Sequence, residues 1–411
     1  MTAQPQEQQS TTADAPSTGP LAGVRVLELG QVIAGPFCGQ MLADLGADVV
    51  KVEPPEVGDV LRQWGWSPDE RDSLWWRVAG RNKRSVTVDL RQPAGQALVR
   101  RLAREVDVVV ENFRPGTVER WGLGYEELSA QNPGLVLVRI SGFGQTGPYS
   151  QRAGYAAIGE AMGGLRSLTG YPDRPPTRVG VSLGDSLTGL MGALGALAAL
   201  QERTRTGRGQ VVDASIYESV LAITEALVPE WAVAHLERHR TGPTLNGIAP
   251  SNVYPTADGQ VLLAANQDSV FARLCAAMGA PELARDPRFV DHRSRGANMA
   301  ELDALIGEWS APQPSADLLE ALHAAGVPAG LLYGPADMAA DPHFAARQSL
   351  VEVEAEGVGP VLMPNVAPKL SRTPGSVRWS GAHLGQHTDD VLREAGLDDD
   401  EVAALRRDGV I

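Results

Sequence analysis

Short apolar runs alternate with amphipathic segments through the first half of the chain. The runs are rich in Val, Ile and Leu and read VRVLELG, VVKVE, SVTVDL, VDVVVENF, LVLVRIS and GQVVDASI. Continuous runs of this kind are typical of strands buried on both faces, and their alternation with helical segments indicates βαβ units. Pro36 and Gly46 mark the start and end of the first helix. The pattern therefore predicts an α/β fold built on a parallel sheet.

The stretch from Val179 to Leu200 has a different pattern. Asp185 is the one charged residue among these 22 positions. From Leu187 onward, small and strongly helix-forming residues recur three and four apart. This predicts a buried helix that packs closely on several sides. Because Gly184 and Asp185 precede the apolar run, the carboxylate is expected at or near the helix N-terminus. An N-cap role and a functional role are both open there.

The pattern changes again after residue 236. Residues 251–266 indicate a hairpin around Asp258-Gly259, and helices are expected over 269–278, 298–309 and 315–325. Short strands return from about 351, and a last helix opens near 385–389. With 411 residues, two domains are expected. We predict a disordered tail (1–20), a large domain (21–225), a small α+β domain (226–335) and a return segment (336–411) that completes the large domain.

Charge and cysteine content narrow the classes of partner and compartment. The chain has 36 basic and 50 acidic residues, a net charge of −14, which disfavours nucleic acid and anionic membranes. Two cysteines cannot form a disulfide framework, and no secretory signal pattern is present, so a cytoplasmic location is expected. The apolar run 187–200 is too short to predict a membrane span.

Loops after the predicted strands supply the candidate site. Parallel sheets bind ligands beyond the carboxyl ends of their strands, where Glu111 to Arg114 and Ser141 to Gly144 would lie. The loop Gly30–Pro36 lacks the G-x-G-x-x-G spacing, which argues against NAD. The cations of Gly80–Ser85 fit either a solvated surface or a phosphate site. Four tryptophans between 59 and 76 fit either a folded loop or a pocket wall.

Elimination leaves a carboxylate as the candidate reactive group. The seven histidines lack metal-ligand spacing, no P-loop or G-x-S-x-G elbow occurs, and Cys38 has no neighbouring base, so no metal site is predicted and a packed Cys38 is expected. A lone carboxylate among glycines and apolar residues can attack an activated acyl group and form an anhydride. Asp185 is the residue to which this chemistry is assigned.

Taken together and in order, seven motifs carry a family resemblance. They read LAGVRVLELGQVIAGPFCGQMLADLGADVVKVE, GRNKRSV, DVVVENFRPG, ISGFGQTGPY, VGVSLGDSLTG, TGRGQVVDASI and LGQHTDDVL. From about Leu21 onward the chain resembles class III CoA-transferases, which include formyl-CoA transferases and 2-methylacyl-CoA racemases. The resemblance implies a Rossmann-like large domain, an inserted smaller domain and an interlocked homodimer. It also implies an acyl-CoA and a carboxylic acid as substrates, without a tightly bound cofactor.

The resemblance also implies residue roles. Asp185 matches the nucleophile that carries first an acyl anhydride and then a CoA thioester, and the amides of Gly142 and Gly144 would stabilise oxyanions. Positions matching CoA contacts are Ile33, Ala34, Val88, Asp89, Leu90, Arg91, Asn112, Phe113, Arg114, Arg120, Ser141 and Phe143. From their charge alone, Lys83 and Arg84 are added as neighbours of the CoA phosphates.

Departures from the family patterns bear on the substrate. Ile33 replaces the Gln of formyl-CoA:oxalate enzymes, Phe143 replaces their Tyr, and their glycine-rich lid is absent around 245–250, which argues against oxalate. Tyr155 replaces a racemase His, and tyrosine is a poor proton carrier near neutral pH, so a transferase is favoured over a racemase. A non-catalytic CoA-binding subunit is the third alternative. Arg62 or Arg178 would suit a dicarboxylic acid such as succinate, with the tryptophans shaping its pocket.

Overall fold

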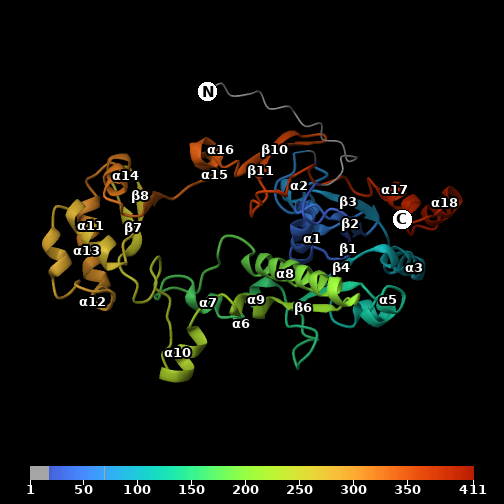
Figure 1. Cartoon of the computed structure of the whole chain (residues 1–411), viewed down its shortest axis with the longest axis horizontal. Helices are drawn as coiled ribbons and strands as arrows, with labels where there is room; N and C mark the ends of the chain where they lie inside the picture. The colour runs from blue at the N-terminus through green and yellow to red at the C-terminus, as the bar shows by residue number, and fades with distance from the viewer. Residues whose placement is uncertain (1–17, 69) are drawn as a thin grey trace. The chain divides into compact units, whose positions relative to one another are not determined.

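The computed structural model describes residues 18–68 and 70–411, so most of the predicted tail lies outside the described residues. The chain divides into two compact units (Figure 1). The first comprises residues 18–164, 181–224 and 343–411, and the second comprises 165–180 and 225–342. The sequence placed 165–180 in the large domain, whereas the structure assigns this segment to the second unit.

A six-stranded sheet organises the first unit. Its strands are β1 (Arg25–Glu28), β2 (Asp48–Glu53), β3 (Lys83–Thr87), β4 (Val108–Glu111), β5 (Val136–Ser141) and β6 (Val211–Ser215). They lie in the order β3-β2-β1-β4-β5-β6, and every neighbouring pair is parallel. The order reverses between β1 and β4, which is where doubly wound sheets bind ligands. The predicted α/β class with a parallel sheet is confirmed.

Helices cover both faces of this sheet (Figure 1). One apolar cluster contains Leu27 and Leu29 and packs against α3 (Pro93–Leu102) and α17 (Thr388–Glu394). The other contains Val26 and packs against α1 (Ala34–Asp44) and α8 (Leu183–Thr206). The helices of the unit are α1 (Ala34–Asp44), α2 (Leu74–Ala79), α3 (Pro93–Leu102), α4 (Thr117–Arg120), α5 (Tyr125–Gln131), α6 (Ala156–Met162), α8 (Leu183–Thr206), α9 (Ile216–Leu221), α17 (Thr388–Glu394) and α18 (Asp399–Arg407). Alternating side chains of buried strands thus serve two cores.

The long helix α8 extends beyond the predicted apolar run at both ends. A Cβ on Gly189 would lie 2.8 Å from the Ala34 carbonyl oxygen of α1, and one on Gly192 would lie 3.2 Å from Ile140 of β5. These two glycines therefore permit close packing against the helix and the sheet. By length and composition α8 could cross a membrane, but its packed glycine face is that of a core helix.

The return segment adds a two-stranded antiparallel hairpin to the first unit, formed by β10 (Leu350–Ala355) and β11 (Gly359–Pro364). Helix α16 (Pro342–Ala346) precedes it at the boundary between the units. The segment then contributes Val391 and Leu392 of α17 to the core beneath β1 and β2. Short 3₁₀ turns occupy Val60–Gln63 and Ala103–Glu105.

The second unit is of α+β type. Its antiparallel sheet contains β7 (Ser251–Pro255), β8 (Gln260–Ala264) and β9 (Ala329–Leu331), and the predicted hairpin around Asp258-Gly259 is confirmed. Its core includes Tyr254, Phe271 and Phe289. The helices are α7 (Leu165–Leu168), α10 (Leu227–Ala234), α11 (Asp268–Ala277), α12 (His292–Ala297), α13 (Met299–Ser310), α14 (Ser315–Ala324) and α15 (Pro335–Ala340), with a 3₁₀ turn at Pro281–Arg285.

Candidate active site

A cavity of about 310 Å³ lies at the carboxyl ends of β1 to β4. It is lined by Leu29, Gln31, Val52, Glu53, Pro54, Val57, Val88, Asp89, Leu90, Arg91, Phe113 and Trp121. The structure thus brings together five residues predicted to contact CoA, namely Val88 to Arg91 and Phe113. The cavity lies at the reversal of strand order, where an open parallel sheet is expected to bind its ligand.

The walls of this carboxyl-edge cavity combine aromatic rings with one exposed cation. Phe113 and Trp121 meet edge to face, with ring centroids 5.0 Å apart. The Arg91 side chain is 84% exposed, and its Nε lies 2.9 Å from Asp89. Hydrogen bonds from Arg91 hold the pKa of Asp89 below its ordinary value. A ligand with a flat ring and an anionic group suits these walls.

The C-terminal residues of the chain bond the turn that lines one side of the same cavity. The Asp89 backbone N–H donates to the Val410 carbonyl oxygen at 2.8 Å. The Gln92 side-chain amide donates to the Gly409 carbonyl oxygen at 2.9 Å, across 317 positions of sequence. These bonds fix the turn after β3 that carries Val88 to Arg91.

Asn112 and Asp59 hold the loop that follows β1. Asn112 accepts a hydrogen bond from the Gln31 N–H at 2.8 Å and donates one to the Gln31 carbonyl oxygen at 2.7 Å. The Val32 N–H donates to the Asp59 carboxylate at 3.1 Å, and Val32 has a φ of 69°. A β-branched residue in the left-handed region is strained and needs such support. Asn112 therefore binds the loop with its side chain rather than reaching outward.

Ile33 and Ala34 begin α1 with their side chains in apolar cores. Ile33 is 8% exposed and packs in a cluster with Leu61 and Trp76, while Ala34 belongs to the core beneath α8. Their predicted contact with CoA would therefore use backbone atoms. Cys38, one turn later, is fully buried, and burial raises the pKa of its thiol, so the expectation of a packed cysteine is confirmed.

A buried ionic network lies under the loop after β1. Lys51 Nζ is 3.0 Å from Asp59 and 3.3 Å from Glu28, and it also donates to the Gly30 carbonyl oxygen. Lys83 Nζ is 2.8 Å from Glu28 and donates to the Pro36 carbonyl oxygen at 2.6 Å. Lys83 is 1% exposed, and burial lowers its pKa. The prediction that Lys83 lies near the CoA phosphates is wrong, because this ammonium is enclosed and paired.

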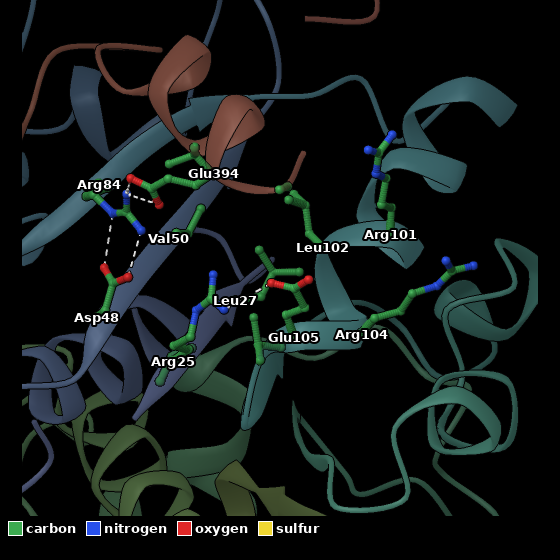
Figure 2. A pocket seen from close by; sticks show the side chains of 14 residues that line it. Arg25, Leu27, Asp48, Val50, Arg84, Arg101, Leu102, Arg104, Glu105 and Glu394 are labelled. Atoms are coloured by element: carbon green, nitrogen blue, oxygen red, sulfur yellow. Dashed lines mark hydrogen bonds and ion pairs between the residues drawn. The ribbon is translucent and has the colours of Figure 1, made fainter. Parts of the chain in front are cut away.

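Arg84 occupies the opposite edge of the sheet from the carboxyl-edge cavity. Figure 2 shows its guanidinium between Asp48, at 2.6 Å, and Glu394, at 2.8 Å. Arg84 lines a second pocket, of about 140 Å³, which is formed by the amino ends of β1 to β3 together with α3 and α17. The phosphate role predicted for Arg84 is also wrong, because β3 begins at Lys83 and its carboxyl end lies at Thr87.

Asp185 lies in the first turn of α8 and is partly buried. The N-cap residue is Ser182, so the N-cap interpretation of Asp185 is wrong, although its predicted place at the helix start is confirmed. The positive end of the helix dipole favours an ionised carboxylate there. Asp185 therefore has the local field that a nucleophilic carboxylate needs.

In the glycine loop after β5, the backbone amides of Gly142 and Gly144 have different surroundings. The Gly144 N–H donates to the Ser141 hydroxyl at 2.9 Å, so its predicted oxyanion role would require this bond to break and stays a prediction. Gly142 packs against Gly154, and a Cβ on Gly142 would lie 3.2 Å from the Gly154 Cα. The oxyanion role of Gly142 stays a prediction. The Phe143 ring meets Tyr149 edge to face at 6.2 Å.

The other predicted arginines have separate surroundings. Arg62 is buried and bonded to Glu53 and Asp72, so its predicted role in binding a substrate carboxylate is wrong. Arg114 and Arg120 are exposed beyond β4, and Arg178 is exposed in the second unit. Of the four tryptophans, Trp76 is core, whereas Trp64, Trp66 and Trp75 are exposed. Within residues 18–68 and 70–411, no cluster of three His, Cys, Asp or Glu residues suits a metal ion.

Residues 21–388 match the family model described as CoA-transferase family III. The chain belongs to CoA-transferase family III. It is 55% identical to the succinyl-CoA–D-citramalate CoA-transferase of Chloroflexus aurantiacus over 95% of this chain and 98% of that protein. It is 39% identical to the succinate–glutarate CoA-transferase of Agrobacterium fabrum, covering 91% and 95% of the two chains. A CAIB/BAIF family protein from Brucella suis superposes with a TM-score of 0.81 at 38% identity, covering 92% and 99%.

In this family III CoA-transferase, a buried contact between Glu111 and Arg139 supports the loop after β4. Glu111, the last residue of β4, accepts from Arg139 Nε at 2.7 Å and from the Phe113 N–H at 2.8 Å. Burial raises the pKa of Glu111 to about 7 despite the nearby Arg139. Sequence reasoning placed Glu111 among the loops but assigned it no role, because the partner lies on the neighbouring strand.

The raised pKa of Glu111 makes the stability of the transferase depend on pH. Between 4.5, its ordinary value, and about 7, the folded protein keeps the proton while the unfolded chain loses it, so the free energy of unfolding falls as pH rises through this window. Glu111→Gln cannot titrate. The free energy of unfolding of this variant, relative to that of the native protein, is expected to rise by up to about 3 kcal/mol between pH 5 and pH 7.5. Urea unfolding at both pH values measures this, with exposed Glu126→Gln as control. Equal pH dependence of Glu111→Gln and native protein would contradict the assignment.

Proposed function

We propose that this enzyme moves CoA from succinyl-CoA to a small dicarboxylic acid. The observation that carries the proposal is the 55% identity, over almost the whole chain, with a transferase whose name specifies succinyl-CoA and D-citramalate. A second relative acts by its name on succinate and glutarate, which is again a dicarboxylic pair. The carboxyl-edge cavity supports CoA binding, with Phe113 and Trp121 beside the adenine and Arg91 near a phosphate.

Asp185 would carry the reaction in two stages. Its carboxylate oxygen attacks the thioester carbonyl, the C–S bond breaks, and an acyl-aspartyl anhydride and CoA thiolate form. The thiolate then attacks the aspartyl carbonyl, the anhydride C–O bond breaks, and the donor acid leaves as a carboxylate. The acceptor carboxylate repeats both steps in reverse. One negative charge is present throughout each step, so no proton donor is needed.

The transferase chemistry is favoured over racemisation by the residue at position 155. Moving a proton between two faces of a carbon next to a thioester needs two proton carriers. Tyr155, at the N-cap of α6, is 79% exposed and replaces the racemase His. Incubating an enantiopure 2-methylacyl-CoA in heavy water tests the alternative, and deuterium on the α-carbon would establish a racemase.

A panel of acceptors tests the proposed function. Purified protein is incubated with succinyl-CoA and, separately, D-citramalate, L-malate, glutarate, oxalate and acetate, and the CoA esters are separated by mass. We expect a new dicarboxyl-CoA and an equal amount of succinate for at least one acceptor. Absence of transfer to every dicarboxylate would contradict the proposal. If the protein binds CoA but forms no covalent adduct and transfers no CoA, it would instead be a non-catalytic CoA-binding subunit.

We also propose that two copies form the interlocked homodimer implied by the family resemblance. The exposed side chains of Leu190 and Leu194 on α8 and of Ile158 and Met162 on α6 support this assembly. Helices α6 and α8 contact each other, and contiguous exposed apolar surface is usual at protein interfaces. Light scattering of the purified protein is expected to give twice the chain mass of 43.5 kDa, and a single-chain mass at micromolar concentration would contradict it.

A further inference from the structure

The first turn of α8 is bonded to a carboxylate from another helix. Glu160 of α6 is 1% exposed, and its Oε1 accepts a hydrogen bond from the Gly184 N–H at 3.2 Å. The N-cap residue Ser182 makes no side-chain capping bond to this turn. Glu160 therefore caps the Gly184 amide of α8 from α6. The bonded amide belongs to the residue directly before Asp185.

Glycines hold Glu160 within reach of that amide. A Cβ on Gly184 would lie 3.0 Å from the Glu160 Cγ, so the side chain passes directly over this backbone. On α6, a Cβ on Gly159 would lie 2.4 Å from Ile216, and one on Gly163 would lie 2.7 Å from Val220. These two glycines, one turn apart, allow α6 to pack closely on α9. The position of Glu160 is thus fixed by backbone packing on both sides.

We infer that Glu160 is a positioning residue that orients the Asp185 carboxylate for both nucleophilic steps. This inference rests on the proposed function of Asp185. The Glu160 bond fixes the peptide group that precedes Asp185, and a small displacement of a reacting group can lower a rate about 100-fold. Positioning requires a hydrogen-bond acceptor at this distance from Gly184, whereas the negative charge of Glu160 is not required.

Three substitutions separate reach from charge. Glu160→Gln keeps an acceptor oxygen at the same distance without the charge, whereas Glu160→Asp keeps the charge but is one methylene shorter. Glu160→Ala removes both. We expect Glu160→Gln to retain kcat within about 3-fold, and Glu160→Asp and Glu160→Ala to lose about 10-fold to 100-fold. The KM for the acyl-CoA is expected to stay within about 2-fold, because Glu160 contributes no group to the carboxyl-edge cavity.

Two further measurements separate this inference from the proposed function and from simple unfolding. Hydrogen exchange at the Gly184 amide is expected to be slow in the native protein and in Glu160→Gln, and faster in the Asp and Ala variants, whether or not the enzyme turns over. Glu202→Ala, at the other end of α8, serves as a control and is expected to keep native kcat. An active native enzyme with a fully active Glu160→Ala variant would overturn the inference alone, as would Glu160→Gln being as impaired as Glu160→Ala. An inactive native enzyme would overturn the proposed function, and the exchange rates would still test the bond.

Discussion

Asp185→Asn is expected to lower kcat for CoA transfer at least about 10⁴-fold, which corresponds to roughly 5.5 kcal/mol of transition-state stabilisation. The amide has nearly the shape of the carboxylate but is a very poor nucleophile toward a thioester. The side chain is partly buried at the helix start, where a neutral group of the same size fits without rearrangement. The affinity for CoA should therefore remain within a few-fold of the native value, whereas kcat should fall.

Trapping with hydroxylamine or borohydride after incubation with succinyl-CoA gives the decisive readout for Asp185. The native protein should show a mass change on the peptide that contains Asp185, and the Asn variant should show none. Asp185→Ala serves as a second variant because it cannot regain a carboxylate by deamidation. Residual activity above about 1% in Asp185→Ala, with the same melting temperature as the native protein, would refute the nucleophilic role.

Lys51→Met is expected to lower the free energy of unfolding by about 3–5 kcal/mol. The Lys51 side chain is fully buried, and its ammonium faces both Asp59 and Glu28. Burial opposes the charge, but these two carboxylates outweigh it and raise the pKa of Lys51 above its ordinary value. Methionine fills a similar volume but removes the cation 3.0 Å from Asp59 and leaves Glu28 paired with Lys83 alone, so buried negative charge is no longer fully compensated. The loss of stability therefore arises from buried negative charge rather than from poorer packing.

Urea unfolding followed by tryptophan fluorescence measures the effect of Lys51→Met. The matched control is Arg205→Met, which removes an exposed cation paired with Glu202 on the surface of α8. That change should stay within about 0.5 kcal/mol, because an exposed ion pair contributes little. A loss below about 1 kcal/mol for Lys51→Met would show that Glu28 and Asp59 are neutralised in another way.

The sheet could be predicted because each strand carries its own signal. Runs such as 106–113 and 135–141 are apolar on both faces, and burial on both faces follows directly from that pattern. The fates of Lys83 and Arg84 could not be predicted in this way. Arg84 pairs with Glu394, which is 310 positions away, and Lys83 is enclosed by Glu28 of another strand. Local sequence contains the charges but not their partners.

The features of the candidate site also divide into those with a local sequence signal and those that depend on tertiary packing. The placement of Asp185 followed from a glycine and an acid before an apolar helical run, which is a local signal. The bond from Gly144 to Ser141 is also local, three residues apart, and a turn of that kind could have been predicted. The roles of Glu160 and Asp59 depend on how α6 and the loop after β1 pack, and no spacing in the sequence reports that packing.

The bonds from Asp89 and Gln92 to Val410 and Gly409 have a consequence for biosynthesis. A ribosome adds about 5–20 residues each second, so the partners of Asp89 and Gln92 emerge roughly 15–60 s after them. During that interval the nascent turn after β3 lacks two of its hydrogen bonds, whereas residues 225–342 are already available to fold as a unit. The carboxyl-edge cavity, which Val88 to Arg91 line, is thus among the last features of the polypeptide to mature.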